Sequence, residues 1–287
     1  MTDVISIQSQ VVHGHVGNSA AVFPMQAAGL EVAAVPTALL SNHPHYPTMR
    51  GRILQSELLA DLLRGVEERG LVDQAKAVVT GYLGSVENAH VVADFLRRAR
   101  TRNPSLLYVC DPVIGDDDLG IFVDEGLIAI FRDALVPMAS IITPNRFELG
   151  RLSNREVRSV LEVDTAARAL CERGTRAVVT TGCVLDDTPP GSVETRVGSS
   201  IQSSGTAITQ LPIRPCGTGD LFTALLIVRL LAGMTVHEAA AGATKEIFAV
   251  LERTRAAGAT EMRIIGYPFA TVSDLRIAGT FTNGEQV

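Results

Sequence analysis

The chain has 287 residues, of which 46% are hydrophobic and 20% charged, a composition typical of a folded globular protein rather than a disordered segment. Its formal net charge of −6 argues against nucleic acid or an anionic membrane as the main partner, because both select a basic surface. No apolar stretch reaches the roughly 20 residues of a membrane span, and the first residues lack the pattern of a signal peptide. We therefore expect a cytoplasmic protein that acts on small molecules.

The cysteines and lysines exclude two further kinds of site. The four cysteines are scattered without paired spacing, which favours a reducing compartment over a disulfide framework or a zinc site. The only lysines, Lys76 and Lys245, lie outside glycine-rich loops. A Walker-type phosphate loop, which needs Gly-Lys-Ser/Thr, is therefore absent.

Short apolar strands alternate with amphipathic segments of helical length along most of the chain. This alternation predicts an α/β fold, a three-layer sandwich with helices on both faces of a mostly parallel sheet. The expected strands are 4–8, 31–40, 77–80, 106–110, 140–142 and 177–180. The expected helices are 19–28, 54–69, 87–100, 125–135, 165–173, 219–231 and 236–253.

Two segments depart from this alternation. Residues 184–214 are rich in Pro, Gly, Ser and Thr, which predicts hairpin strands and loops at an edge of the sheet. The tail from about residue 258 is polar, and its pattern assigns no secondary structure. Because no linker divides the chain, residues 1–287 are expected to form a single domain.

The segment Gly217-Thr218-Gly219-Asp220 directly precedes an apolar run of helical length. The glycines permit a tight turn, and the N–H groups and positive dipole end of the following helix attract an anion such as phosphate. A carboxylate beside a phosphate is unfavourable unless it has a role, and accepting a proton from an attacking hydroxyl is such a role for Asp220. The alternative is that Thr218 or Asp220 caps the helix.

Polar residues also follow each of the other predicted strands, where ligands bind in open α/β sheets. Asn145 and Glu148 follow the strand 140–142 with a spacing that also fits a capping box. As an alternative to capping, Glu148 with Asp111 and Asp116 supplies oxygen ligands for Mg²⁺ beside a nucleotide's phosphates. The neighbouring Asp117 and Asp118 are better explained as a solvated loop.

Four of the six histidines form two His-x-His pairs, 13/15 and 43/45, so a transition-metal site has to be considered. Gly14 and Pro44 interrupt the pairs, and we find no cysteine or carboxylate nearby that completes a ligand set. A hydrogen bond from His45 to a small ring substrate is the preferred interpretation. Tyr82, which lies between Gly81 and Gly84, packs either in the core or against a planar ligand.

Taken together, these segments resemble the bacterial branch of the pyridoxal kinases, which belong to the ribokinase-like superfamily. The resemblance extends from about residue 4 to residue 255. In chain order, the matching blocks are 6–19, 35–46, 80–82, 110–116, 142–149 and 217–222. It is most specific in the first and fourth of these blocks.

The resemblance implies phosphorylation of the 5′-hydroxymethyl group of pyridoxal, pyridoxine and pyridoxamine by ATP, with Mg²⁺ and, as a further option, a monovalent cation such as K⁺. Asp220 would be the general base, with the amides of Gly217, Thr218 and Gly219 facing the transferred phosphoryl group. Relatives usually act as cytoplasmic homodimers. The remaining implied positions are Ser9, His45 and Tyr82 for the pyridine ring; Asp111, Thr143, Asn145, Glu148, Thr181 and Gly217 for ATP; Glu148, Asp116 and the backbone of Phe122 for the metal ion; and lid elements near 41–52 and 115–123.

Two residues depart from the family pattern. Phe122 stands where close relatives have tyrosine, and His43 stands where they have threonine. Both changes affect the expected order of preference among substrates.

Three other functions are compatible with parts of this pattern. A hydroxymethylpyrimidine kinase shares the fold and also acts on an aromatic alcohol. A sugar kinase is disfavoured because the chain has few clustered carboxylates and amides for a polyhydroxyl ligand. A non-catalytic pyridoxal-binding protein would have no use for the carboxylate of Asp220.

Overall fold

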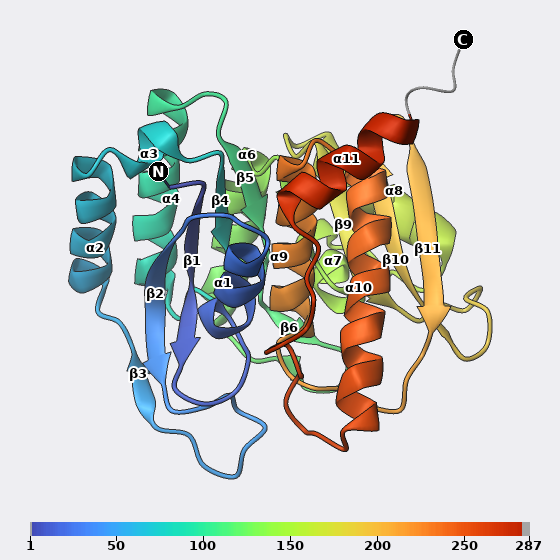
Figure 1. Ribbon diagram of the computed structural model, residues 1–287. Coiled ribbons are helices and arrows are strands. Elements are labelled where there is room, and N and C mark those ends of the chain that lie inside the picture. The colour runs from blue at the N-terminus through green and yellow to red at the C-terminus, as the bar shows by residue number, and fades with distance from the viewer. Residues whose placement is uncertain (1, 283–287) are drawn as a thin grey trace.

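The computed structural model describes residues 2–282, with side chains up to residue 277. Nine strands form one sheet in the order β11-β10-β9-β8-β5-β4-β1-β2-β3, and β6 and β7 form a separate hairpin (Figure 1). The strands are β1 (Val4–Val11), β2 (Val32–Leu40), β3 (Gly51–Ile53), β4 (Ala77–Thr80), β5 (Leu107–Cys110), β6 (Gly115–Asp116), β7 (Gly120–Ile121), β8 (Ile141–Ile142), β9 (Ala177–Cys183), β10 (Ser192–Ser199) and β11 (Ser203–Thr209).

The central six strands are parallel, and antiparallel strands close both edges of the sheet. β1 pairs in parallel with β2 and β4, and the parallel order continues through β5, β8 and β9. β3 is antiparallel to β2, and β10 and β11 form the antiparallel hairpin at the opposite edge. The mostly parallel sheet and the hairpin expected from residues 184–214 are both confirmed.

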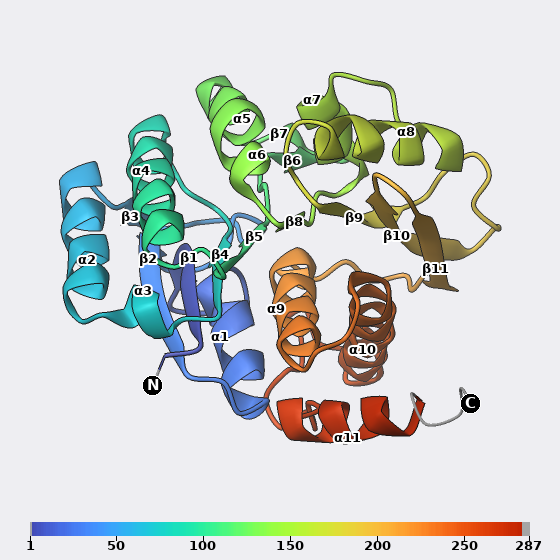
Figure 2. The same cartoon turned by 90° about the horizontal axis from the view of Figure 1, so that it is seen from above.

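Helices cover both faces of the sheet, so the three-layer arrangement is also confirmed (Figure 2). Helices α1, α9, α10 and α11 lie on one face, and α2 to α8 lie on the other. The helices are α1 (Asn18–Ala27), α2 (Ser56–Glu68), α3 (Leu71–Gln74), α4 (Val86–Arg102), α5 (Glu125–Ile130), the π-helical turn η1 (Phe131–Leu135), α6 (Val136–Met138), α7 (Arg146–Ser153), α8 (Val160–Cys171), α9 (Thr218–Leu231), α10 (Val236–Ala256) and α11 (Val272–Thr282).

Helix α9 is buried along nearly its whole length, from Leu221 to Arg229. It packs between α1 and α10 and lies against the sheet, and α11 also contacts it. A helix that is apolar on all sides is stable only in such an interior position. The helix begins at Thr218, one residue before the predicted start.

Helix α8 begins earlier than the sequence pattern suggested. It starts at Val160 rather than at residue 165, because Ser159 and Glu162 form a capping box. In that motif each side chain accepts the backbone N–H of the other residue, which satisfies two N–H groups of the first turn. The predicted boundary was wrong by five residues because it did not take account of the Ser-x-x-Glu pattern at 159–162, which is typical of a helix N-terminus.

The structure of the polar tail from about residue 258, which the sequence left open, is well defined up to α11. Met262, Ile264 and Phe269 are buried in the core that α9 and α10 form, and α11 follows them. These apolar residues have neither helical nor strand spacing, so their burial is not visible in the sequence. Over residues 2–282, no helix combines the length and apolar character needed to cross a membrane.

Candidate active site

The carboxyl ends of five parallel strands are held in one row by backbone hydrogen bonds that continue past the strands. The N–H of Gly81 donates to the carbonyl of Ile7 at 3.1 Å, and that of Asp111 donates to the carbonyl of Thr80 at 2.8 Å. Thr143 N–H donates to Cys110 at 3.0 Å, which adds the next strand to the row. The residues predicted for the site after β1, β4, β5 and β8 are thus at the same edge of the sheet, as expected for parallel strands.

Thr181 and Asn145 extend this row to β9. The N–H of Thr181 donates to the carbonyl of Pro144 at 2.9 Å, and Thr181 pairs with Asn145 as an isolated parallel bridge. The hydroxyl groups of Thr143 and Thr223 lie 2.9 Å apart, and both residues are buried. That contact connects the end of β8 to the first turns of α9, beside the predicted phosphate site.

The turn before α9 depends on a glycine at position 217. Gly217 has φ of 83°, and a Cβ added there would lie 1.7 Å from the carbonyl oxygen of His15. Both the left-handed backbone and the close approach exclude a larger residue. The N-cap residue Gly217 has no side chain that could cap α9, while the carboxyl group of Asp220 interacts with its own backbone N–H in this turn. The N–H groups of Thr218 and Gly219 remain available to an anion.

Asp220 lies in the first turn of α9 and is only partly exposed. Burial raises the pKa of its carboxyl group to about 6, while a hydrogen bond from the backbone N–H of Gly17 acts in the opposite direction. The carboxyl group is therefore mostly ionised at neutral pH and remains a stronger base than an exposed aspartate. Such a pKa suits proton transfer near neutral pH.

Asp111 and Glu148 are two further carboxyl groups, and both are buried. Burial, with the nearby charges of Glu148 and Asp220, raises the pKa of Asp111 well above its usual range. Burial also raises the pKa of Glu148 to about 7, although three backbone N–H groups donate to it. Asp111 is also adjacent to the turn of α9, since a Cβ added at Gly219 would lie 3.8 Å from its Oδ2.

Asn145 and Glu148 form the capping box that was considered as an alternative to a ligand-binding role. Glu148 N–H donates to Asn145 Oδ1, and Asn145 N–H donates to Glu148 Oε2, both at 2.9 Å. The other oxygen of Glu148 accepts the N–H of Ile114 at 2.9 Å, and Asn145 Nδ2 donates to the carbonyl of Gly115 at 2.8 Å. The capping box thus also holds the base of the β6–β7 hairpin.

The carboxylate of Asp116 forms the turn of this hairpin. Its Oδ1 accepts the N–H groups of Asp118 and Leu119, at 3.0 and 2.6 Å. Phe122 follows the hairpin with 47% of its surface exposed, and its N–H donates to the carbonyl of Ile114 at 3.2 Å. Two of the three predicted metal-binding positions, Asp116 and Phe122, therefore lie in the predicted lid segment, and Asp116 already has a structural role there.

The residues predicted to hold a ring substrate come from separate segments. Ser9 is buried against Gly17, where a Cβ would lie 2.5 Å from its Oγ, and Gly17 is the residue whose N–H donates to Asp220. His45 is exposed, and its Nδ1 lies 3.1 Å from Sγ of Cys216, next to the turn of α9. Tyr82 is partly buried, which raises its pKa, and its carbonyl accepts the hydroxyl of Thr37 at 2.6 Å.

The sequence analysis missed several residues at this end of the molecule, of which Glu261 is the most connected. Its Oε1 accepts from Tyr46 Oη at 2.8 Å and lies 2.7 Å from Nε2 of His43, and its Oε2 accepts the N–H of His15 at 3.2 Å. Glu261 thus joins the tail to the segment between β2 and β3. The contact with His43 spans 218 residues, and no local pattern indicates it.

The expectation that no cysteine or carboxylate lies near the second histidine pair was wrong. Cys216 contacts His45 and Glu261 contacts His43, although both partners are distant in sequence. Burial and the surrounding carboxylates raise the pKa of the Cys216 thiol to about 11, so the thiol is neutral at physiological pH.

Comparisons with known proteins agree with this geometry. A family model described as phosphomethylpyrimidine kinase matches residues 17–264. The chain is 42% identical to a pyridoxine/pyridoxal/pyridoxamine kinase of Bordetella avium, over 91% of this chain and 88% of that one. It is 37% identical to a pyridoxal kinase of Granulibacter bethesdensis, over 91% and 92% of the two chains.

The solved structures show the same relationship. The pyridoxal kinase of Leishmania donovani in complex with ADP and pyridoxamine is 28% identical and superposes with a TM-score of 0.86, over 93% of this chain and 95% of that one. The ribokinase-like fold implied by the sequence resemblance is therefore confirmed. With matches of this extent and identity, the chain belongs to the phosphomethylpyrimidine kinase family, among its pyridoxal kinases.

Proposed function

We propose that this chain transfers the γ-phosphoryl group of ATP to the 5′-hydroxymethyl group of pyridoxal, pyridoxine and pyridoxamine, a reaction that salvages vitamin B6. The observation that carries the proposal is the position of Asp220. This carboxylate, with a pKa of about 6, lies in the first turn of a helix whose N-cap residue is Gly217, where the N–H groups of Thr218 and Gly219 are available to a phosphate.

Asp220 accepts the proton of the substrate hydroxyl as that oxygen attacks the γ-phosphorus in line. The amides of Gly217, Thr218 and Gly219 donate to the phosphoryl oxygens, on which negative charge develops in the transition state. Because the transition state is loose, positioning and electrostatics account for most of the rate, and the base adds roughly 10²–10⁴-fold.

The carboxylates fit a divalent cation. Asp111 and Glu148 are buried, and the charge of Glu148 raises the pKa of Asp111, so a cation near these carboxyl groups would offset the repulsion. Carboxylate oxygens are the ligands that Mg²⁺ prefers, and Glu148 with Asp116 and the carbonyl of Phe122 would hold it beside ATP. When bound, Mg²⁺ neutralises charge on the phosphate oxygens. Thr143, Asn145 and Thr181 would contact the nucleotide.

The ring of the vitamin would lie between Ser9, His45 and Tyr82. Their location supports this, because Ser9 packs against Gly17 beside Asp220 and His45 contacts the residue before Gly217. The exposure of Phe122 and the position of His43 next to this segment would then alter the preference among vitamers.

The test is coupled ATP consumption with pyridoxal, pyridoxine, pyridoxamine and hydroxymethylpyrimidine as acceptors. We expect turnover with the three vitamers, and a decrease in kcat of about 10²–10⁴-fold for Asp220→Asn. Asp61→Asn, which changes an exposed carboxyl on α2, is the matched control and should behave as the wild type. Near-normal turnover of Asp220→Asn would show that Asp220 is not the general base.

A second candidate function is phosphorylation of a hydroxymethylpyrimidine. It is favoured by the description of the family model, phosphomethylpyrimidine kinase. The same assay separates the two, because faster turnover of the pyrimidine alcohol than of any vitamer would reverse the assignment. Binding of pyridoxal without ATP consumption would instead indicate a carrier.

We also propose that the chain is a single domain that works as a cytoplasmic homodimer. One continuous nine-stranded sheet supports the first part. Exposed apolar side chains on neighbouring elements at one edge support the dimer: Leu39 on β2, Ile53 on β3, and Leu58 and Leu62 on α2.

A further inference from the structure

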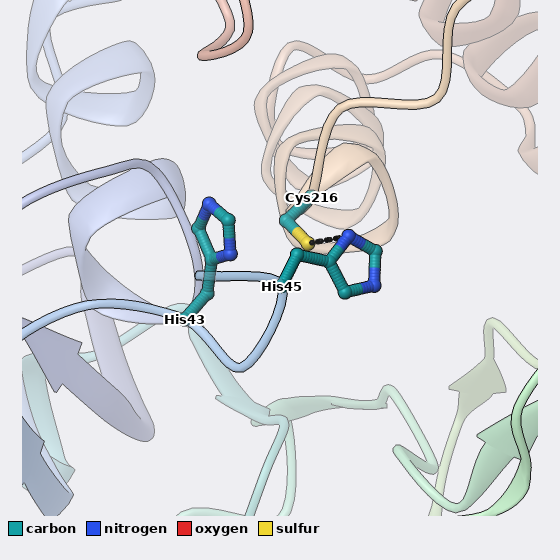
Figure 3. A group of neighbouring side chains, drawn as sticks. All are labelled: His43, His45 and Cys216. Atoms are coloured by element: carbon teal, nitrogen blue, oxygen red, sulfur yellow. Dashed lines mark hydrogen bonds between the residues drawn. The ribbon is translucent and has the colours of Figure 1, made fainter. Parts of the chain in front are cut away.

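His43, His45 and Cys216 come together beside the start of α9, and they are called the His₂Cys cluster below. One ligand atom from each residue lies within 4.8 Å of those of the other two. Figure 3 shows the two histidines on the segment between β2 and β3 and the cysteine on the segment that leads into α9, with the sulfur between the two rings. The three side chains therefore converge from two parts of the chain that are far apart in sequence.

His43 provides the second observation. Its side chain is 7% exposed, and its Nδ1 is a buried polar atom without a hydrogen-bond partner in the described structure. A buried polar atom without a partner is unfavourable by about 1–3 kcal/mol, so such an atom calls for an explanation. In Figure 3 one ring nitrogen of His43 faces the sulfur of Cys216.

The other nitrogen of His43 is held by a carboxylate. Nε2 of His43 lies 2.7 Å from Oε1 of Glu261, which in turn accepts the hydroxyl of Tyr46. Histidines that bind metals commonly donate their second N–H to a carboxylate, which fixes the tautomer and leaves the other nitrogen free to bind. Glu261 therefore orients Nδ1 of His43 in the way that a metal ligand requires.

The separations also fit one ion. Zn–N distances of about 2.0–2.1 Å and a Zn–S distance of about 2.3 Å place tetrahedral ligands about 3.3–3.6 Å apart. Sγ of Cys216 and Nδ1 of His45 are already 3.1 Å apart, and the remaining separations need movements of about 1 Å. His45 itself is exposed and lies on the segment 44–50, in which every residue except Tyr46 is exposed.

We propose that the His₂Cys cluster is a binding site for a borderline or soft transition metal of the Zn²⁺ class. His43 Nδ1, a ring nitrogen of His45 and the thiolate of Cys216 are the three ligands, and water takes a fourth position. Binding forms a metal–sulfur bond and releases the thiol proton to solvent. Imidazole and thiolate ligands select such metals, whereas the carboxylates of Asp111 and Glu148 select Mg²⁺.

A bound metal would tie the segment between β2 and β3 to the turn before α9. Both His45 and that turn belong to the proposed substrate site, so the metal would exclude the ring substrate. That consequence rests on the proposed function, whereas metal binding itself does not. Direct binding measurements therefore test the site even if the proposed reaction fails.

The experiment titrates metal-free, full-length protein with Zn²⁺ against a chromophoric chelator, with excess Mg²⁺ present to occupy the carboxylate site. We expect one Zn²⁺ per chain and affinity at least tenfold lower for Cys216→Ser. Cys171→Ser removes a similarly half-buried thiol on α8 and should leave the affinity unchanged. Co²⁺ as the probe should give a thiolate-to-cobalt charge-transfer band and intense visible bands, which indicate tetrahedral coordination.

The proposal is overturned if the wild-type protein binds no stoichiometric Zn²⁺, if Cys216→Ser binds it as tightly, or if the Co²⁺ spectrum lacks the charge-transfer band. Circular dichroism checks that each variant folds. If Cys216→Ser does not fold, His43→Gln makes the same comparison, and unchanged affinity in that variant equally overturns the site.

Discussion

The raised pKa of Asp220 makes its carboxylate a stronger base and also lowers the stability of the folded protein at neutral pH. Its folded-state pKa of about 6 exceeds the ordinary value of 3.8, so the folded state disfavours the ionised form. The stability that the group contributes is complete below pH 4 and is lost as the pH rises to about 6. At neutral pH the ionised carboxylate therefore destabilises the fold, in the protonation state that the proposed role as a base requires.

The first prediction is that Asp220→Asn stabilises the protein at pH 7.5 although it lowers turnover. The rise from 3.8 to about 6 corresponds to at most about 3 kcal/mol, and solvent screening of a partly exposed group reduces the expected gain to about 1–2 kcal/mol. Chemical denaturation at pH 7.5 and pH 4 measures it, with Asp61→Asn as the control. If Asp220→Asn is less stable than the wild type at pH 7.5, the ionised Asp220 carboxylate does not destabilise the fold.

The second prediction concerns the pH dependence of kcat/KM. Asp220 with a pKa of about 6 and Glu148 with a pKa of about 7 must both be ionised, so kcat/KM should fall below pH 7 and more steeply below pH 6. In Asp220→Asn, the remaining activity should keep only the decrease near pH 7. A flat profile from pH 5 to pH 8 in the wild type would exclude both assignments.

At the scale of elements, the turn before α9 is the most constrained part of the site. The third prediction is that Gly217→Ala loses stability and kcat/KM together, because its Cβ would overlap the carbonyl oxygen of His15. Gly233 at the other end of α9 also has positive φ, 99°, but no atom lies within 4 Å of an added Cβ. Gly233→Ala should therefore lose only about 1 kcal/mol, with unchanged kinetics. Equal losses in the two variants would show that φ alone determines the effect.

The fourth prediction concerns the tail that follows α10. Glu261→Gln weakens the hydrogen bonds to His43 and Tyr46, which hold the segment between β2 and β3. We expect a several-fold increase in KM for the vitamer with a smaller change in kcat, because the chemistry at Asp220 is not touched. Glu252→Gln on α10 is the control. A decrease in kcat with KM unchanged would indicate a different role for Glu261.

The sequence predicted those parts of the fold and site that depend on local patterns. Alternating apolar segments indicated the parallel strands, and the glycines before a long apolar run indicated the start of α9. Residues at strand ends, such as Asp111 and Thr143, were brought together because parallel strands place their carboxyl ends at one edge. These features require only short stretches of sequence to recognise.

The contacts that sequence analysis missed join segments without a shared pattern. Cys216 and His45 are 171 residues apart, and neither has a neighbour that indicates the other. Met262 and Phe269 are buried through irregular backbone, so their spacing gives no periodicity. Such contacts arise only when the tertiary packing is complete.

At the scale of the whole molecule, the edge of the sheet near β3 remains apolar. Leu39, Leu58 and Leu62 are 52%, 51% and 38% exposed on adjacent elements. A single exposed leucine is common on a protein surface. Three of them beside an apolar groove of about 300 Å³, which Leu39 lines, favour contact with a second copy of the chain.

The fifth prediction is that the chain sediments as a dimer of about 61 kDa, twice the 30.5 kDa of one chain. Leu39→Glu and Leu58→Glu should each shift the equilibrium toward monomer, because a carboxylate would have to be buried at the interface. Leu161→Glu, on the exposed face of α8, is the control. A wild-type chain that sediments as a monomer at micromolar concentration contradicts the proposed assembly.

The row of strand ends has a consequence for the synthesis of the protein. Its first member, Ile7, leaves the ribosome well before Asp220 and Glu261, which follow much later in the chain. A nascent chain that has completed the first five parallel strands still lacks the proposed general base and Glu261, which holds the segment 41–50. Vitamin and nucleotide therefore cannot act as templates for early folding, because the proposed catalytic centre forms only after the chain up to Glu261 has emerged.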